Sequence, residues 1–165
     1  MGRARASGDG RRRWSGSSIP EVTSPHTPVA ELTEDESWEK LSSVALGRLV
    51  TRIANAMFIF PVNFVTQRGT VLFRTAEGSK LFSAAVSDEV LFEADDYTSS
   101  AGWSVIVRGT AEVLSGASQI EEAEQAALLP WVATTKLRYV RITPTVTTGR
   151  QFVFGPEPDD GSVAG

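Results

Sequence analysis

Residues 73–81 bring together side chains that bind phosphate; their sequence is FRTAEGSKL. We expect a strand to end at Arg74 and a short helix to begin near Ser79. A guanidinium, hydroxyls, an ammonium and the free N–H groups of a helix start then lie close together. Arginine offers a planar fork and lysine a point charge, and together they suit a dianionic phosphate. The segment predicts a phosphate site at Arg74, Thr75, Ser79 and Lys80, with a solvated turn as the alternative.

Pro61 and Asn63 lie in a second segment that suits a planar ring. Pro61 interrupts a predicted strand at 57–66. A proline cannot donate to a sheet ladder, so we expect this point to lie at an edge or a bulge. Backbone groups left unpaired there, together with the Asn63 amide, match the edge carbonyls and ring nitrogens of a heterocycle. The alternative is an edge strand whose asparagine is buried or forms a turn.

Two later segments leave two interpretations each. Residues 102–109 have the pattern of a strand with Trp103 at its start. An indole at that position either packs in the core or at a dimer interface, or contacts a ligand. Residues 148–150 are where we expect a last strand to begin. Arg150 then either points its cation at an anion or ring edge, or lies on the surface of a hairpin connection.

The composition excludes most active sites built from side chains alone. The 165 residues include no cysteine and one histidine, His26. This excludes a disulfide framework, a thiolate nucleophile, an iron–sulfur cluster, a Cys-ligated zinc and any site with two histidine ligands from one chain. A Ser-His-Asp triad would have to use His26, which lies between prolines in a polar segment. Carboxylate-bound cations and chemistry supplied by a bound organic cofactor remain.

The elements that must position these groups follow from the residue pattern. Thr33 and Glu36 form a capping box, and apolar residues at helical spacing continue the helix until Gly47 ends it. Gln67-Arg68-Gly69 predicts a tight hairpin connection. Further helices are predicted at 79–86 and 117–127, and strands at 48–53, 57–66, 70–74, 90–94, 103–114, 138–143 and 149–154. About six strands with short connections predict a mainly β fold, a small antiparallel barrel.

Composition divides the chain into a body and two tails. Residues 1–31 are rich in Gly, Ser, Pro and Arg and predict a disordered basic tail, residues 32–154 one folded domain, and residues 155–165 a flexible tail. Residues 1–20 carry a net charge of +4 and residues 21–165 a net charge of −8. An acidic body argues against nucleic-acid binding. No apolar run approaches the about 20 residues that span a bilayer, and no signal-peptide pattern is present, so we expect a cytoplasmic protein.

Five segments occur in an order and spacing that carry a resemblance. They are GRL at 47–49, PVNF at 61–64, FRT and GSKL within 73–81, GWSV and RG within 102–109, and VRITP and TGR within 140–150. Together they resemble the pyridoxamine 5′-phosphate oxidase-like family of flavin-binding split β-barrels, closest to its small actinobacterial and nitroimidazole-resistance-like subgroup. The resemblance covers roughly residues 32–154. It implies an antiparallel six-stranded split β-barrel with a few short helices.

The resemblance also implies a homodimer that binds FMN at the subunit interface and acts as an oxidoreductase on a small-molecule substrate. The flavin then carries the hydride or electrons. The residues that it assigns to the cofactor are Pro61, Val62, Asn63 and Phe64 along the ring, Phe73, Arg74, Thr75, Ser79 and Lys80 at the phosphate, and Trp103, Ser104 and Arg150 near the interface. The C-terminal Arg/His substrate motif of true pyridoxamine phosphate oxidases is replaced here by Gly, Pro and Asp, so vitamin B6 oxidation is not expected.

Two alternatives remain open on the same fold. The deazaflavin F420 also carries a phosphate, but its longer anionic tail needs more basic residues than this acidic body offers. A flavin-binding or flavin-sensing module without enzymatic activity is the second alternative. A His-ligated haem is not expected, because the one histidine lies in the predicted tail.

Overall fold

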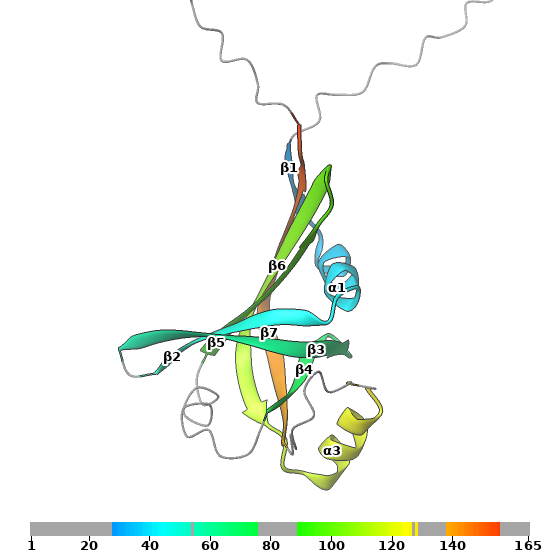
Figure 1. Cartoon of the computed structure of the whole chain (residues 1–165). Helices are drawn as coiled ribbons and strands as arrows, with labels where there is room; N and C mark the ends of the chain where they lie inside the picture. The colour runs from blue at the N-terminus through cyan, green and yellow to red at the C-terminus, as the bar shows by residue number, and fades with distance from the viewer. Residues whose placement is uncertain (1–27, 54, 76–88, 127, 129–137, 156–165) are drawn as a thin grey trace, which may run out of the picture.

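The computed structural model describes residues 28–53, 55–75, 89–126, 128 and 138–155 (Figure 1). Its elements in chain order are β1 (Val29–Leu32), α1 (Glu34–Ser42), β2 (Leu46–Ile53), β3 (Ala56–Gln67), β4 (Thr70–Thr75), β5 (Glu89–Tyr97), β6 (Ala101–Val113), α3 (Ala117–Glu124) and β7 (Arg138–Val153). The predicted helix at 79–86 and most of the two predicted tails lie outside the described residues. None of the described helices is long and apolar enough to cross a membrane.

Six of the strands close into an antiparallel ring. The sheet order is β1-β7-β4-β3-β2-β5-β6, and a further pairing between β6 and β7 closes the ring. β1 lies outside the ring, beside the last residues of β7. It begins at Val29, slightly before the predicted domain start at residue 32. The predicted mainly β fold, a six-stranded antiparallel barrel with short helices, is confirmed.

β7 is a single 16-residue strand and not the two strands that the sequence predicts. β6 pairs with it along nearly its whole length, whereas its other edge pairs with β4 at residues 138–142 and with β1 at residues 149–152. The β6–β7 register shifts between Arg108 and Gly109, which leaves Thr145 as a bulge. The Thr145 hydroxyl donates to the Arg108 carbonyl at 3.0 Å. A bulge bends a strand and accommodates a proline, here Pro144, without ending the pairing.

Helix α1 begins at the predicted cap but ends before the predicted stop. The Glu36 backbone N–H donates to the Thr33 hydroxyl, and the Glu36 carboxylate accepts from the Thr33 N–H at 2.7 Å. That backbone hydrogen bond lowers the pKa of the Glu36 carboxyl. The helix ends at Ser42, and Gly47 lies in β2. A Cβ at Gly47 would overlap the Phe92 ring, so this glycine permits close packing of β2 on β5 and does not end the helix.

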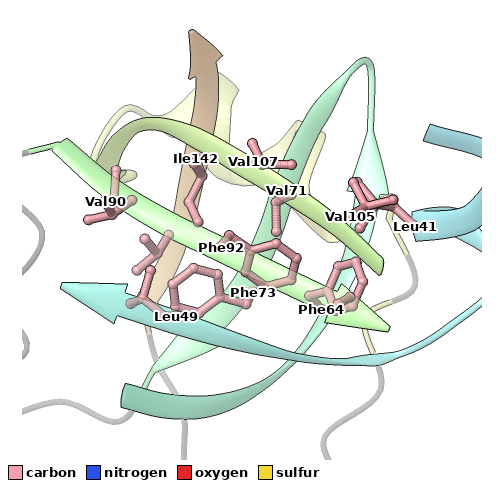
Figure 2. Close-up of a cluster of buried hydrophobic side chains, with 13 residues drawn as sticks. Leu41, Leu49, Phe64, Val71, Phe73, Val90, Phe92, Val105, Val107 and Ile142 are labelled. Carbon is pink, nitrogen blue, oxygen red and sulfur yellow. The ribbon is translucent and has the colours of Figure 1, made fainter. Parts of the chain in front are cut away.

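The barrel interior is filled by apolar side chains from alternate positions of the strands (Figure 2). Phe64 and Phe92 meet edge to face, with ring centroids 4.7 Å apart. Such a pair contributes about 0.5–1.5 kcal/mol beyond the burial of its area. Leu41 of α1 reaches the same cluster. A second, smaller cluster lies under α3 and includes Leu72 and Ala123.

The tight β3–β4 connection is confirmed, but it consists of Arg68 and Gly69 alone because Gln67 pairs with Thr70, and its first residue is strained. Arg68 has φ +50° and Gly69 has φ +70°. Positive φ costs a residue with a Cβ about 1–2 kcal/mol, and asparagine tolerates it better than arginine. We expect Arg68→Asn to raise the free energy of unfolding by about 0.5 kcal/mol. The 3.4 Å ion pair from Arg68 to Glu122 that is lost contributes little, because the arginine is exposed.

Chemical denaturation measures this change. Gly69→Ala is the matched control and is expected to destabilise, because it adds a Cβ at positive φ. A lower stability of Arg68→Asn than of the unchanged protein would contradict the account of the turn.

Candidate functional site

Arg74 lies near the end of β4, directly opposite Tyr139 of β7. The guanidinium carbon of Arg74 is 5.1 Å from the centroid of the Tyr139 ring, within the range of a cation–π interaction. Arg74 is half-buried, and Thr75 pairs with Arg138 at the next position. The pairing therefore gives the predicted phosphate-binding arginine a defined neighbour that the sequence does not indicate.

Asn63 and Arg74 are the residues next to the last pair between β3 and β4. The last β3–β4 pair is Phe64 with Phe73, so Asn63 and Arg74 follow it on the two strands and share the outer face of the sheet. Asn63 is 7% exposed. This buried amide and the half-buried guanidinium therefore lie on one face, each one residue beyond the last β3–β4 pair. Ser79 and Lys80 lie outside the described residues.

Pro61 lies on an open edge of the sheet, as predicted. β2 pairs with β3 from Ala56 to Asn63, whereas β4 pairs with β3 only at residues 64–67. Among the described residues no strand pairs with the second edge of β3 at residues 56–63, so Pro61 lies at an edge of this part of the sheet. Val62 packs against the core cluster.

The side chains of Phe64 and Phe73 point into the barrel. Both are fully buried in the main core cluster, where Figure 2 shows them among their neighbours. Both side chains therefore pack in the core and do not reach the outer face, where Asn63 and Arg74 lie.

Ser104 and Arg150 are brought together on the outer face at the other end of β7. They are direct neighbours in the β6–β7 pairing, and both line a cleft of about 450 Å³. Glu31 of β1 lies opposite Arg150 on its other side. The cleft therefore places a guanidinium between a hydroxyl and a carboxylate.

Trp103 does not share this cleft, because neighbouring residues of a strand point to opposite faces. Its indole packs against the main core cluster and lines a small cleft with Lys40 and Gln151. Gly149 lies inside β7, where a Cβ would overlap the Ser37 side chain of α1. Glycine at this position allows α1 to lie against the strand, and it does not begin a new strand as predicted.

The predicted residues thus occupy two places on one chain. Arg74 lies beside Tyr139 at one end of β7 and Ser104 beside Arg150 near the other, and Figure 1 shows β4 and β1 at these opposite ends. From Tyr139 to Arg150 the strand advances by eleven residue-to-residue steps, about 36 Å of extended backbone at about 3.3 Å per step.

An apolar outer face of the barrel extends between these two places. One row of side chains crosses five paired strands and consists of Ile59, Val50, Leu91, Arg108 and Val146. Met57 and Ile59 are 62% and 65% exposed. Two arginines on this face form ion pairs within the chain. Arg48 contacts both Asp95 and Glu93, whose hydrogen bonds raise the pKa of its guanidinium, and Arg108 contacts Glu89 at 3.2 Å.

A polar network fixes α3 over the end of the barrel that carries Arg74. Arg141 Nη2 donates to Gln67 Oε1 at 3.0 Å and to Glu122 Oε1 at 3.3 Å, and Gln67 Nε2 donates to the Glu122 carbonyl at 2.8 Å. The Arg141 side chain is 13% exposed. Its Nε is buried without a hydrogen-bond partner within the described ranges, so the Nη2 contacts carry the stabilisation of the cation. The sequence gives no signal for this network, because its members are distant along the chain.

The comparison with known families identifies the fold. The sequence profile of the pyridoxamine 5′-phosphate oxidase family matches residues 33–151. The chain belongs to the pyridoxamine 5′-phosphate oxidase family. The family resemblance seen in the sequence is confirmed, and the matched region contains β2–β6, α1 and nearly all of β7.

Solved relatives of this pyridoxamine 5′-phosphate oxidase family member share both its sequence and its fold. A structure described as the FAD binding protein from Mycobacterium smegmatis is 52% identical, covers 75% of this chain and 98% of its own, and has a TM-score of 0.68. A Corynebacterium glutamicum protein, provisionally named a pyridoxamine 5′-phosphate oxidase, is 47% identical, covers 81% of this chain and 100% of its own, and has a TM-score of 0.75. An uncharacterized Mycobacterium tuberculosis protein is 36% identical over 87% of this chain and 94% of its own.

The polar network predicts a stability effect. We expect Glu122→Gln to lower the free energy of unfolding by about 1–2 kcal/mol, because it removes the charge that faces the mostly buried Arg141. Denaturation by urea measures the change. Glu121→Gln, on the exposed side of the same helix, is the matched control and should change stability by less than about 0.5 kcal/mol. Equal effects of the two substitutions would contradict the network's role.

Proposed function

We propose that this protein is a flavin-dependent oxidoreductase that holds FMN between two copies of the chain. The observation that carries the proposal is the position of Arg74 and Asn63 next to the last β3–β4 pair, where the second edge of β3 has no strand partner among the described residues. Arg74 donates to the flavin 5′-phosphate, and the backbone of β3 with the Asn63 amide meets the polar edge of the ring. Thr75, Ser79 and Lys80 complete the phosphate site in this proposal. A bound flavin supplies hydride and electron transfer.

Binding energy requires more than the phosphate contacts. Charge-assisted hydrogen bonds contribute about 1.5–3 kcal/mol each, and association costs several kcal/mol, whereas micromolar affinity needs about 8 kcal/mol. The remaining stabilisation must come from burial of the ring. The open edge of β3 covers one side of a ring, and a second surface is needed for the other.

A second copy of the chain supplies that surface in this proposal. The apolar outer face, with Ile59 and Met57 exposed, is suited to association, and its arginines Arg48 and Arg108 already form ion pairs within the chain. Two-fold symmetry brings different parts of the same surface together. Ser104 and Arg150 of one subunit then reach the cofactor held by Arg74 of the other.

FAD is a second candidate cofactor. It is favoured by the name of the Mycobacterium smegmatis relative, an FAD binding protein that is 52% identical to this chain. FMN and FAD share the ring system and the phosphate that Arg74 recognises, so both fit the same residues.

The bound cofactor tests the function. We expect purified protein to show a flavin absorption spectrum and to release FMN on denaturation, identified by chromatography against FMN and FAD standards. Release of FAD in place of FMN would support the flavin site and identify FAD as the cofactor. Preferential binding of F420 in a parallel titration would contradict the proposal that the cofactor is a flavin. A protein that stays colourless with all three would contradict the proposal, and bound FMN without turnover of NAD(P)H, reduced F420 or artificial acceptors would indicate a non-enzymatic flavin protein.

Subunit complementation tests the shared site. We expect Arg74→Ala and Arg150→Ala each to weaken FMN binding about 10- to 100-fold. A heterodimer of the two variants has one site that lacks both arginines and one site that is intact. We therefore expect differently tagged, co-expressed variants to bind FMN with the original affinity at one site per dimer. A pair of Arg74→Ala chains carrying the two tags is the control, and a heterodimer that binds as weakly as this control would place both arginines at one chain's site.

A further inference from the structure

We propose that Tyr139 is a positioning residue that holds the Arg74 guanidinium in the orientation in which it meets the cofactor phosphate. This inference rests on the proposed flavin site. Arg74 and Tyr139 are directly opposite each other across β4 and β7, and the guanidinium carbon lies 5.1 Å from the ring centroid. An aromatic face at this distance attracts a cation and stacks with the planar guanidinium group.

The ring can hold the arginine because the ring is itself held. Tyr139 is half-buried and packs against the second apolar cluster, whose buried members are Leu72, Leu114 and Ala123. Its carbonyl accepts the Leu114 backbone N–H at 2.9 Å. Ala123 belongs to α3, so the helix covers part of the cluster on which the ring rests. A long arginine side chain loses much conformational freedom on binding a phosphate, and a fixed ring reduces that loss before the ligand arrives.

The same face of β7 connects Tyr139 with the anchor of α3. Residues two apart on a strand share a face, so Tyr139 and Arg141 point to the same side. Arg141 contacts Glu122 of α3, and α3 contacts the cluster under Tyr139. Helix α3 therefore supports the ring of Tyr139, and through it Arg74, although the helix contributes none of the predicted cofactor residues.

The test compares two ligands that differ only in the phosphate, FMN and riboflavin. Tyr139→Leu removes the aromatic face and keeps an apolar side chain, whereas Tyr139→Phe keeps the face and is the matched control. We expect Tyr139→Leu to raise the Kd for FMN about 3- to 10-fold and to leave the Kd for riboflavin unchanged. Tyr139→Phe should keep both constants of the unchanged protein. Fluorescence titration measures both dissociation constants for each variant and for the unchanged protein, and thermal unfolding confirms that each variant is folded.

A double variant separates positioning from general support of the fold. In the Arg74→Ala background, Tyr139→Leu should have no further effect on FMN binding, because the side chain that it positions is already absent. An equal loss of FMN and riboflavin affinity in Tyr139→Leu would assign the residue a purely structural role and overturn the proposal. Unchanged binding of both ligands would overturn it as well.

The failure of this inference is distinguishable from the failure of the proposed function. If the unchanged protein binds neither FMN nor riboflavin, or if Arg74→Ala weakens both equally, the proposed phosphate contact of Arg74 is wrong. If Arg74→Ala weakens FMN alone and Tyr139→Leu does not, only the role of Tyr139 is wrong. Should Tyr139→Leu not fold, Tyr139→Met fills similar space without an aromatic face and has the same expected result.

Discussion

The pairing of β7 with β6 runs from Val140 to Val153, and this one ladder both closes the barrel and sets where every candidate functional group lies. Because β7 is longer than either partner on its other edge, β4 pairs with its first residues and β1 with its last. The bulge at Thr145 lets a strand that contains Pro144 continue through the change of direction. A break there would separate the end that carries Arg74 from the end that carries Arg150.

The two ends differ in how their polar groups are stabilised. At one end, Arg74 lies on the ring of Tyr139, and the network of Gln67, Arg141 and Glu122 fixes α3 nearby. At the other end, Arg150 lies between Ser104 and Glu31 in an open cleft. Contacts within the fold hold Arg74, whereas Arg150 is exposed on the outer face. This difference is the physical basis for proposing that Arg74 binds the cofactor's phosphate and that Arg150 reaches the cofactor held by a partner subunit.

Membership of the pyridoxamine 5′-phosphate oxidase family describes the fold and leaves the reaction to the site. One fold supports many activities, and the side chains of a site decide among them. The chain carries one histidine and no cysteine, and the proposed function assigns hydride and electron transfer to a bound flavin. Relatives with 52% and 47% identity share this barrel, and the tyrosine and arginine pair lies within the region that the family profile matches.

Local features could be predicted from the sequence because neighbouring residues determine them. The capping box at Thr33 and Glu36 and the turn at Arg68 and Gly69 are of this kind, and both are confirmed. The sequence predicts a helix stop at Gly47, whereas the glycine is required there by the ring of Phe92, which lies across the sheet. The sequence predicts two strands in place of β7, because the pairing with β6 that continues through Pro144 leaves no local sequence pattern.

The sequence by itself determined the class of fold, an edge or a bulge at Pro61 and the candidate cations Arg74 and Arg150, since strand propensity, proline and charge are properties of single residues and short segments. Only the tertiary structure decided that Phe64 and Phe73 are core side chains, and that Tyr139 lies against Arg74. It also decided that the predicted cofactor residues divide between the two ends of one strand. The reason is that register and face are set by pairing between residues far apart along the chain, and no local pattern encodes that pairing.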